Sequence, residues 1–325
     1  MRRFKVVLYE DMHPAGQECL RQAGCEVVLA PAQDEGTICR LAADADGIII
    51  RAVGRVSRRV MVSAPCLKVI GRHGTGVDNI DLVAAAERGI TVVNTPLAAV
   101  RSVAEHAVSL MIAAARKLVL ADRAARTGNW NLRYDVRLAD LHGRVLGIVG
   151  LGRIGTAVAR ICRTGFEMIV TYYDIRRNAE AEIELDARWL PIEGLLRTAD
   201  FISLHIPYSP ATHHLISRER LDLVKPTAIL VNTSRGAVVD EAALVAALAE
   251  GRLLGAGLDV FEQEPIGAAS PLAALPNVVL TPHIAAHSEE SLKAMSLVAE
   301  DVVRVLEGKP PRFPVSLPDE PADSE

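Results

Sequence analysis

The sequence predicts an α/β protein built from two doubly wound parallel sheets, and three observations favour this fold class. The chain has 325 residues, which is too long for one ordinary core and fits two domains. Half of the residues are hydrophobic and few are aromatic, which is typical of sheets covered by helices on both faces. Short apolar runs also alternate with helix-like segments in two successive series.

The first series contains five short runs rich in β-branched residues, separated by stretches with helical periodicity. Strands are expected at residues 4–9, 26–29, 47–51, 67–71 and 90–93. Alternation of this kind predicts parallel pairing in one doubly wound sheet. Pro96 then interrupts the pattern, because a proline disfavours helix at the residue before it.

A single long helix is expected over residues 102–126. Ser102 can cap its start, with Glu105 three residues on as the partner in a capping box. The stretch 104–115 is apolar on almost every side, so it must be buried on several sides. Burial between domains or between subunits would satisfy this requirement.

The second series begins at Arg144. Strands are expected at residues 145–149, 168–173, 200–204, 228–231, 255–258 and 278–280, and helices at 154–164, 193–197 and 241–250. A final helix over 288–307 should end at Gly308, with Pro310 just beyond it. The tail 315–325 is rich in proline and acidic residues and is expected to be disordered.

Charge and composition argue against several classes of partner. A net charge of −4 offers no basic surface for a nucleic-acid backbone. No apolar stretch approaches membrane-spanning length, and the N-terminal apolar run is too short for a signal peptide. The five cysteines lack the spacing of a metal site, so we expect reduced thiols and no metal in a soluble, cytoplasmic protein.

A glycine pattern of the form G-x-G-x-x-G lies between an expected strand and an expected helix. Gly150 permits the tight turn, Gly152 lets the backbone approach a pyrophosphate, and Gly155 lets the helix pack against the strand. The helix N-terminus, with Arg153 and Ile154 in its first turn, is suited to bind the phosphates. The sequence therefore predicts a dinucleotide site of the Rossmann type.

Asp174 indicates which dinucleotide binds there. It ends the next expected strand, 24 residues after Gly150, and its carboxylate can accept both ribose hydroxyls of NAD. The same charge would repel the 2′-phosphate of NADP. NAD is the predicted cofactor, while Arg176 and Arg177 keep NADP open because either can pair with that phosphate.

Three side chains after expected strands carry the chemistry that oxidation of a 2-hydroxy acid requires. Arg235 offers a planar fork of donors that matches a carboxylate. His283 is suited to take the hydroxyl proton, and Glu264 can orient its ring and stabilise the imidazolium. In a doubly wound sheet these loops lie at the ligand-binding end. Arg235, Glu264 and His283 are therefore the predicted catalytic residues.

The segments around these residues, N-T-S-R-G, D-V-F-E-Q-E-P and T-P-H-I, strongly resemble the D-isomer-specific 2-hydroxyacid dehydrogenases. The resemblance covers nearly the whole chain. It implies that Arg235 binds the substrate carboxylate, His283 is the acid/base, and Glu264 tunes His283. It also implies a Rossmann cofactor domain, residues 99–287, inserted in a flavodoxin-like substrate domain, residues 1–98 and 288–325. The long helix region would form a homodimer or a dimer of dimers.

The resemblance also implies further cofactor contacts. The H-I-P-Y-S-P-A-T segment would line the adenosine side, and residues near Arg235 and His283 would approach the nicotinamide. An alanine pair stands where many relatives have Gly-Gly or Gly-Ala, so slight crowding is expected beside the ring. The residues are His205, Pro207, Thr212, Thr233, Ser234, Asp259, Ala285 and Ala286.

The substrate is expected to meet the first domain. Gly74, Thr75 and Gly76 would offer backbone N–H groups to its carboxylate, as the equivalent loop does in relatives. Arg51 and Arg72 could hold a more distant anionic group or could form salt bridges under the loop. The loop most resembles that of phosphoglycerate dehydrogenases, although the segment after Arg51 departs from theirs and no regulatory C-terminal domain is expected.

The favoured substrate is 3-phosphoglycerate. The alternative is a glyoxylate or hydroxypyruvate reductase, or another D-2-hydroxyacid dehydrogenase. A remote alternative is a corepressor-like binding protein that senses NAD, which can retain the catalytic residues and would show very slow hydride transfer. A formate dehydrogenase is disfavoured, since that family has Gln where this chain has Glu264.

The other histidines have plainer interpretations. His106 lies on the expected buried helix and is interpreted as a structural residue. His73 lies beside the substrate loop, so it is either structural or in contact with substrate. His213, His214 and His287 are expected at the surface, without the spacing of a metal site.

Overall fold

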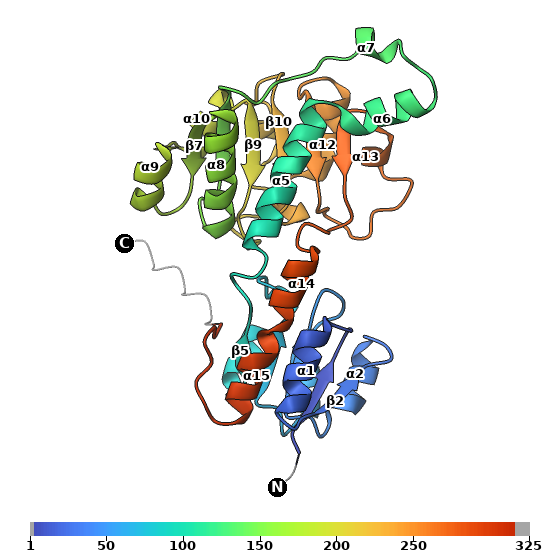
Figure 1. The fold of residues 1–325 in the computed structure, drawn as a ribbon, viewed down its shortest axis with the longest axis vertical. Helices are drawn as coiled ribbons and strands as arrows, with labels where there is room; N and C mark the ends of the chain where they lie inside the picture. Colours follow the sequence, from blue (N-terminus) through green and yellow to red (C-terminus); the bar gives the residue numbers. More distant parts are fainter. Residues whose placement is uncertain (1–2, 316–325) are drawn as a thin grey trace. The chain divides into compact units, whose positions relative to one another are not determined.

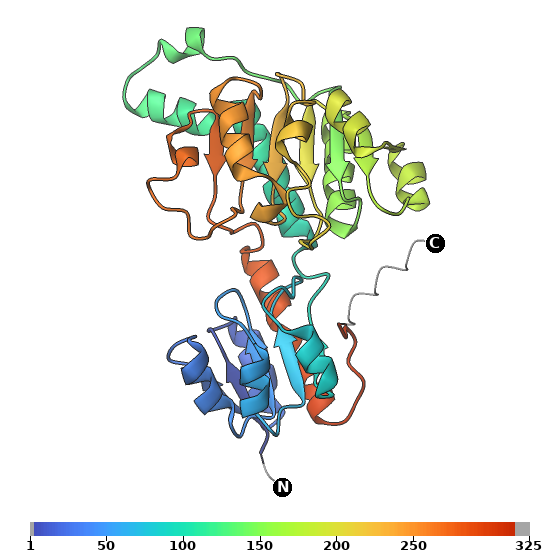
Figure 2. The same ribbon diagram turned by 180° about the vertical axis from the view of Figure 1, so that it is seen from behind.

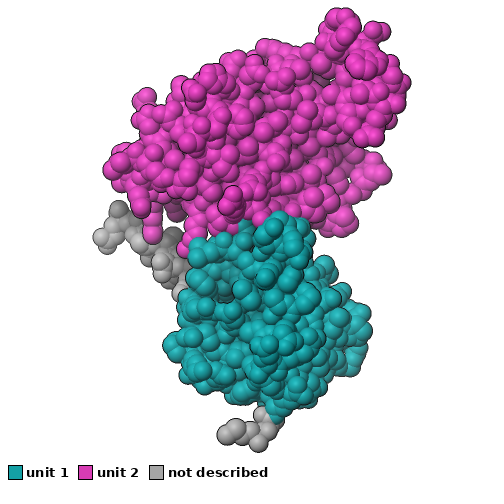
Figure 3. Space-filling model, in the orientation of Figure 1, with its two compact units in different colours: residues 1–99, 287–325 teal, residues 100–286 magenta. Residues whose placement is uncertain are grey.

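The computed structural model describes residues 3–315, so most of the tail expected to be disordered lies outside the described residues. The chain folds into two compact units, Met1–Ala99 with His287–Glu325 and Val100–Ala286 (Figure 3). We call them unit 1 and unit 2. Each has its own sheet and its own core on both faces of that sheet.

Unit 1 contains a sheet of five parallel strands in the order β2-β1-β3-β4-β5. This is the flavodoxin-like order of a doubly wound sheet. The predicted fold class is confirmed, and every expected strand is present with ends shifted by at most two residues. The strands are β1 (Lys5–Leu8), β2 (Glu26–Leu29), β3 (Gly47–Ile50), β4 (Val69–Arg72) and β5 (Thr91–Val93).

Helices cover both faces of this sheet. One face packs against α1 (Pro14–Gln22) and α15 (Val298–Leu306), and the other against α2 (Glu35–Ala42), α3 (Arg58–Ser63) and α4 (Leu82–Glu87) (Figures 1 and 2). The C-terminal helices therefore belong to unit 1. The expected single helix 288–307 is wrong in one respect. Its first part is α14 (Glu289–Ser296), capped by Ser288, and the two helices meet at Leu297, where the hydrogen bonds tighten to three-residue spacing.

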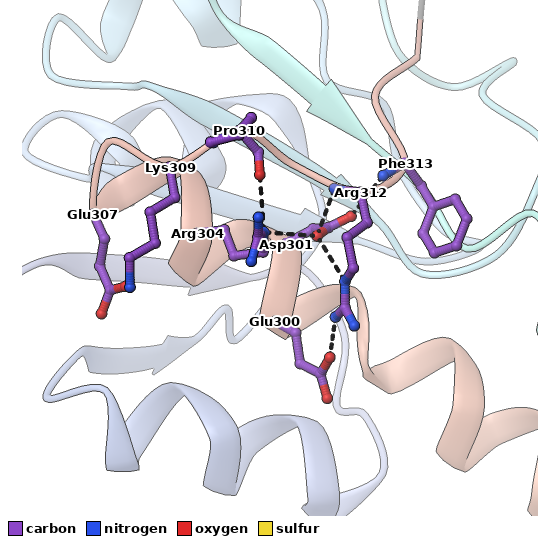
Figure 4. Close-up of polar contacts among 8 residues, drawn as sticks. All are labelled: Glu300, Asp301, Arg304, Glu307, Lys309, Pro310, Arg312 and Phe313. Carbon is purple, nitrogen blue, oxygen red and sulfur yellow. Dashed lines mark hydrogen bonds and ion pairs between the residues drawn. The ribbon is translucent and has the colours of Figure 1, made fainter.

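A buried carboxylate fixes the chain that follows α15. Asp301 is 2% exposed and accepts the backbone N–H groups of Arg312 and Phe313 at 3.0 and 2.9 Å (Figure 4). Arg304 and the side chain of Arg312 lie beside the same carboxylate. The segment then pairs antiparallel with β5 through a bridge between Val93 and Pro314. Asp301 thus holds a short segment against the edge of the sheet.

Unit 2 contains a sheet of seven parallel strands in the order β12-β11-β10-β9-β6-β7-β8. The six strands from β8 to β11 follow the Rossmann order, and β12 is one further strand at the edge. The two-residue strand β8 was not predicted because it is too short to show a pattern. The strands are β6 (Val145–Val149), β7 (Ile169–Tyr173), β8 (Arg188–Trp189), β9 (Phe201–Leu204), β10 (Ile229–Asn232), β11 (Gly255–Leu258) and β12 (Val278–Leu280).

The helices of unit 2 again form two layers (Figures 1 and 2). One layer contains α5 (Val100–Ala115), α8 (Arg153–Phe166) and α9 (Ala179–Leu185). The other contains α10 (Ile192–Thr198), α11 (Arg218–Leu221), α12 (Glu241–Ala249) and α13 (Pro271–Ala274). Two short helices, α6 (Leu118–Arg126) and α7 (Leu132–Asp135), follow α5, and a 3₁₀ turn covers Gly236–Val238.

The expected helix 102–126 is wrong in its start and its continuity, whereas its expected burial on several sides is confirmed. The helix α5 begins at Val100, and Glu105 pairs with Arg101 instead of closing a capping box. Lys117 has a φ of 51°, which ends a right-handed helix, and its Nζ donates to the carbonyl of Leu254 at 2.8 Å. The apolar sides of α5 pack against α8 and the sheet of unit 2 itself, so neither another domain nor another subunit is needed.

Candidate active site

The glycine loop after β6 has the geometry that the pattern predicted. Gly150 has a φ of 94°, and a Cβ there would lie 2.7 Å from the carbonyl oxygen of His205. A Cβ on Gly155 would lie 2.1 Å from the carbonyl oxygen of Gly150. Because no real Cβ tolerates such distances, Gly150 is required for the close approach of the segment after β9, and Gly155 for the close approach of α8 to β6.

The residues around the N-terminus of α8 fit a dinucleotide. Gly152 is the N-terminal cap of α8, and a Cβ there would meet open space. Arg153 is exposed and Ile154 is half-buried in the first turn. The hydroxyl of Thr233, after β10, is buried and has no hydrogen-bond partner among residues 3–315. Free N–H groups at a long helix and an unsatisfied hydroxyl are the groups that a bound dinucleotide would satisfy.

Asp174 lies against the glycine loop. Its Oδ2 accepts the backbone N–H of Leu151 at 2.9 Å, so the carboxylate is held where a ribose would approach the loop. Arg177 is engaged by Glu182 at 2.7 Å, whereas Arg176 is exposed. Of the two arginines that kept NADP open, one is therefore committed to an internal ion pair.

The segment expected at the adenosine side uses its side chains to hold its own shape. Burial lowers the pKa of His205 to about 3, and its ring meets Ser203 at 2.8 Å. The hydroxyl of Thr212 accepts the N–H of Ser209 at 2.7 Å and donates to the carbonyl of exposed Pro207 at 2.8 Å. The backbone of His205, not its ring, borders the glycine loop.

His283 and Glu264 are in direct contact. The Nδ1 of His283 lies 2.7 Å from Oε2 of Glu264, and Oε1 of Glu264 accepts the N–H of Phe261 at 3.0 Å. Burial raises the pKa of Glu264, but the hydrogen bonds from His283 and Phe261 outweigh it and leave the pKa below its usual value. The carboxylate is therefore ionised at neutral pH and oriented toward the imidazole.

Arg235 lies three residues beyond β10, and its neighbours fix its backbone. The side chain of Asn232 donates to the carbonyl of Arg235 at 2.9 Å and accepts the N–H of Ser234 at 3.0 Å. A Cβ on Gly236 would lie 1.8 Å from the carbonyl carbon of Phe261, so this turn packs directly on the segment that leads to Glu264. The strands β10, β11 and β12 are neighbours in the sheet, which brings the three predicted catalytic segments to one edge.

Asp259, an expected cofactor contact, lies at the centre of a hydrogen-bond network. It is fully buried, and its Oδ1 accepts the hydroxyl of Thr281 at 2.6 Å and the N–H of Ile284 at 2.9 Å. Its Oδ2 accepts the N–H of Ala285 at 2.9 Å, while Ala286 follows half-buried. Asp259 therefore organises the loop that carries the catalytic candidate after β12, and contact with the nicotinamide stays a prediction.

The sequence interpretation missed three supporting residues. Asn232 and Gly236 flank Arg235 in its motif, and Thr281 stands two residues before His283. Small or amide residues at fixed offsets from a candidate were the available signal. Their roles become visible only once β10, β11 and β12 are side by side.

The predicted substrate residues lie in unit 1, at the carboxyl ends of β3 and β4. Arg51 donates to the carbonyl of Asp11, and Arg72 donates to the carbonyl of His73. Burial lowers the pKa of His73 to about 3, helped by the positive charges of Arg51 and Arg72, so its ring is neutral. Its Nε2 has no hydrogen-bond partner within the described residues.

The loop after His73 is tied to the end of β5. The N–H of Gly74 donates to the hydroxyl of Thr95 at 3.1 Å, and Asn94 donates to the carbonyl of Thr75 at 2.8 Å. Gly76 is half-buried in the same loop. The structure therefore gathers all five predicted substrate residues in unit 1 and the catalytic candidates in unit 2.

No group of three or more His, Cys, Asp or Glu side chains is arranged to hold a metal ion in the part of the chain from residue 3 to 315. Over the same residues, none of the helices has both the length and the apolar character needed to cross a membrane.

Comparison with known proteins assigns the larger part of unit 2. Residues 108–285 match the family model for the "D-isomer specific 2-hydroxyacid dehydrogenase, NAD binding domain". A glyoxylate reductase from Korarchaeum cryptofilum is 46% identical over 272 residues, which cover 82% of each chain. A solved 2-hydroxyacid dehydrogenase from Ketogulonicigenium vulgare is 35% identical, with a TM-score of 0.86 over 98% of this chain and 99% of that one.

A longer relative is also similar over part of its length. A D-3-phosphoglycerate dehydrogenase from Archaeoglobus fulgidus is 39% identical over 323 residues, or 99% of this chain. The alignment covers 61% of that relative, so this chain spans about three fifths of its length. The two relatives are named for different substrates, while their similarity to this chain is of the same order.

Proposed function

This chain belongs to the D-isomer specific 2-hydroxyacid dehydrogenase family, and we propose that Arg235, Glu264 and His283 are its catalytic residues. It is an NAD-dependent oxidoreductase that acts on the CH–OH group of 2-hydroxy acids, and residues 108–285 are its NAD-binding domain. When bound, NAD would supply the hydride acceptor for oxidation of the hydroxy acid and, in its reduced form, the hydride donor for reduction of the oxo acid.

Each side chain has one task in the proposed reaction. Arg235 binds the substrate carboxylate through its planar guanidinium. His283 takes the hydroxyl proton at Nε2 during oxidation and returns it during reduction. Glu264 keeps Nδ1 protonated and stabilises the positive charge that the ring acquires.

The observation that carries this proposal is the 2.7 Å contact between His283 and Glu264. Because Glu264 is ionised and accepts a hydrogen bond, it selects the ring tautomer that carries the proton on Nδ1. Nε2 is then free to exchange a proton with the substrate. A corepressor-like sensor can retain the same pairing, so the rate of hydride transfer distinguishes it from an enzyme.

Replacing His283 tests the proposal. His283→Asn should lower kcat/KM by about a thousandfold, since positioned proton transfer contributes ~10²–10⁴. The dissociation constant for NADH, measured by fluorescence, should change less than twofold because the phosphate and ribose residues are untouched. A variant that stays folded, binds NADH and loses less than fivefold in kcat/KM would contradict the assignment.

For the substrate we propose a 2-hydroxy acid with a second anionic group, with 3-phosphoglycerate as the first candidate. Arg51 and Arg72 lie at the carboxyl ends of neighbouring strands, beside the neutral ring of His73. A relative named D-3-phosphoglycerate dehydrogenase supports this candidate. Glyoxylate is the second candidate, since a relative of similar length and 46% identity is named for it.

A substrate panel separates the two candidates. With Arg51→Ala and Arg72→Ala combined, kcat/KM for 3-phosphoglycerate should fall at least a hundredfold, because each charge-assisted hydrogen bond contributes roughly 1.5–3 kcal/mol. The value for glyoxylate should change less than threefold. Arg55→Ala, an exposed arginine in the same segment, is the control. Equal losses on 3-phosphoglycerate, glycerate, glyoxylate, lactate and sulfolactate would contradict a distal anion site.

We also propose that the enzyme is a homodimer, alone or paired into a dimer of dimers. The segment α6–α7 stands away from the sheet of unit 2 (Figures 1 and 2). This segment and the residues just after it expose several large apolar side chains, and a large exposed apolar surface marks an interaction site: Leu118, Val119, Trp130, Tyr134 and Leu138. We also propose that the protein is cytoplasmic, which its five free cysteines support.

A further inference from the structure

A histidine on α5 is joined to the loop that carries His283. The Nε2 of His106 lies 3.0 Å from the hydroxyl of Thr281 and 3.5 Å from Oδ1 of Asp259. We propose that His106 is a positioning residue, which acts through Thr281 and Asp259 to hold His283 in its working geometry. This inference rests on the proposed catalytic role of His283.

The hydrogen bonds have a defined direction. The hydroxyl of Thr281 has one proton and lies 2.6 Å from Oδ1 of Asp259, which can only accept when ionised. Since that proton is used, the contact between Thr281 and His106 requires His106 to be the donor at Nε2. His106 therefore supplies the first hydrogen bond of a chain that runs from α5 to the carboxylate after β11.

Asp259 in turn determines the path of the loop. It accepts the backbone N–H groups of Ile284 and Ala285, and its own carbonyl accepts the N–H of His283 at 2.8 Å. His283 has a φ of 54°, a left-handed conformation that a non-glycine residue keeps only when its surroundings enforce it. The hydrogen bonds to Asp259 lie on both sides of this residue and enforce the conformation.

The charge of Asp259 depends on the same donors. Burial raises the pKa of Asp259, but the hydrogen bond from His106, with those from Thr281, Ile284 and Ala285, leaves it below its usual value. The titratable groups around it are His106 on α5, Glu264 after β11 and His283 after β12. Loss of the donor on α5 weakens the preference for the ionised carboxylate and loosens the loop.

A series at position 106 tests the inference in the full-length enzyme. His106→Leu should lower kcat about tenfold, the effect of one lost hydrogen bond, with an NADH dissociation constant within twofold of the wild type. His106→Gln retains an N–H donor at a similar reach and should recover kcat to within threefold. Ser109→Ala, an exposed position one turn along α5, should behave as the wild type.

Two further measurements exclude a merely structural effect. The acid limb of the kcat profile should move to higher pH in His106→Leu and return in His106→Gln, at equal thermal stability. Thr281→Val should lose activity as His106→Leu does, and the double variant should lose no more than either single one, because both break one chain of hydrogen bonds.

The outcomes are distinguishable from failure of the proposed function. Equal kcat values and pH profiles for His106→Leu and Ser109→Ala would overturn the inference, as would equal losses in the Leu and Gln variants. If His283→Asn retains activity, the catalytic assignment fails instead, whatever the series at position 106 shows.

Discussion

His283 and Glu264 combine access with orientation. Their side chains are 52% and 35% exposed, so substrate can reach the imidazole while solvent still screens the pair. An ion pair this exposed contributes little to stability. The pair matters for the reaction because Glu264 carries a charge. The lowered pKa of Glu264 keeps its carboxylate ionised at pH values where an ordinary glutamate is already protonated. The contribution of the ionised Glu264 carboxylate to stability is fully present above the usual pKa of a glutamate. It is lost as the pH falls through the lowered pKa of Glu264.

Glu264→Gln should therefore lower kcat/KM by roughly 30- to 100-fold at neutral pH, since the amide orients the ring but cannot stabilise its positive charge. The part of the acid limb that follows protonation of Glu264 should vanish, because glutamine does not titrate. Initial rates between pH 4 and pH 9 measure both effects. Glu262→Gln removes a neighbouring carboxylate that contacts His214 and is the control.

The sequence motifs predicted the candidate catalytic residues but not the hydrogen bonds that position them. Arg235, Glu264 and His283 stand out because their residue types match the chemistry. The structural role of Asp259 could not be read in this way, since its hydrogen-bond partners come from α5 and from the loop after β12, far away in the sequence. A buried carboxylate reveals its partners only after the strands are assembled.

At the scale of elements, Asp301 connects α15 to the segment beside β5. Asp301→Ala should lower the free energy of unfolding by about 2–4 kcal/mol, because it removes the buried carboxylate that accepts the N–H groups of Arg312 and Phe313 and lies beside two arginines. Urea unfolding of unit 1, monitored through hydrogen exchange at the amides of β5, measures the loss of stability. Glu300→Ala, which removes only an exposed partner of Arg312, should cost less than 1 kcal/mol. Equal losses in the two variants would contradict this account.

The periodicity of apolar residues in the sequence predicted the strands and the buried faces of the helices. It did not predict where the helices break. The predicted helices 102–126 and 288–307 each divide in two, at Lys117 and Leu297. Neither position has a glycine or proline to mark it. At Lys117 the break coincides with a hydrogen bond to the carbonyl of Leu254, a tertiary contact that local sequence does not contain.

At the scale of the whole molecule, the exposed apolar segment α6–α7 predicts association. Trp130→Asp combined with Tyr134→Asp should convert the proposed dimer into a monomer, since a buried charge would oppose the contact. Light scattering coupled to size-exclusion chromatography at micromolar concentration measures the mass. Ile183→Asp alters an equally exposed apolar residue on α9 and should leave the mass unchanged. A wild-type monomer at this concentration would contradict the proposal.

The doubly wound parallel class of both sheets could be predicted from the sequence. That the C-terminal helices return to unit 1 was implied only by the resemblance. Strand alternation alone does not give that return, because helical periodicity is the same wherever a helix packs. The contact between α15 and α1 depends on apolar side chains such as Leu20 and Val302 meeting over one sheet face. Such a meeting involves residues at opposite ends of the chain.

This arrangement has a consequence for synthesis on the ribosome. Unit 2 is one continuous stretch, Val100–Ala286, and can close its core as it emerges. Unit 1 cannot, because one face of its sheet waits for α15. At translation rates of about 5–20 residues per second, the part of that face covered by α15 stays open for roughly ten to forty seconds. Nascent chains therefore expose Ile49, Val69 and Val93 to chaperones until the last helices are made.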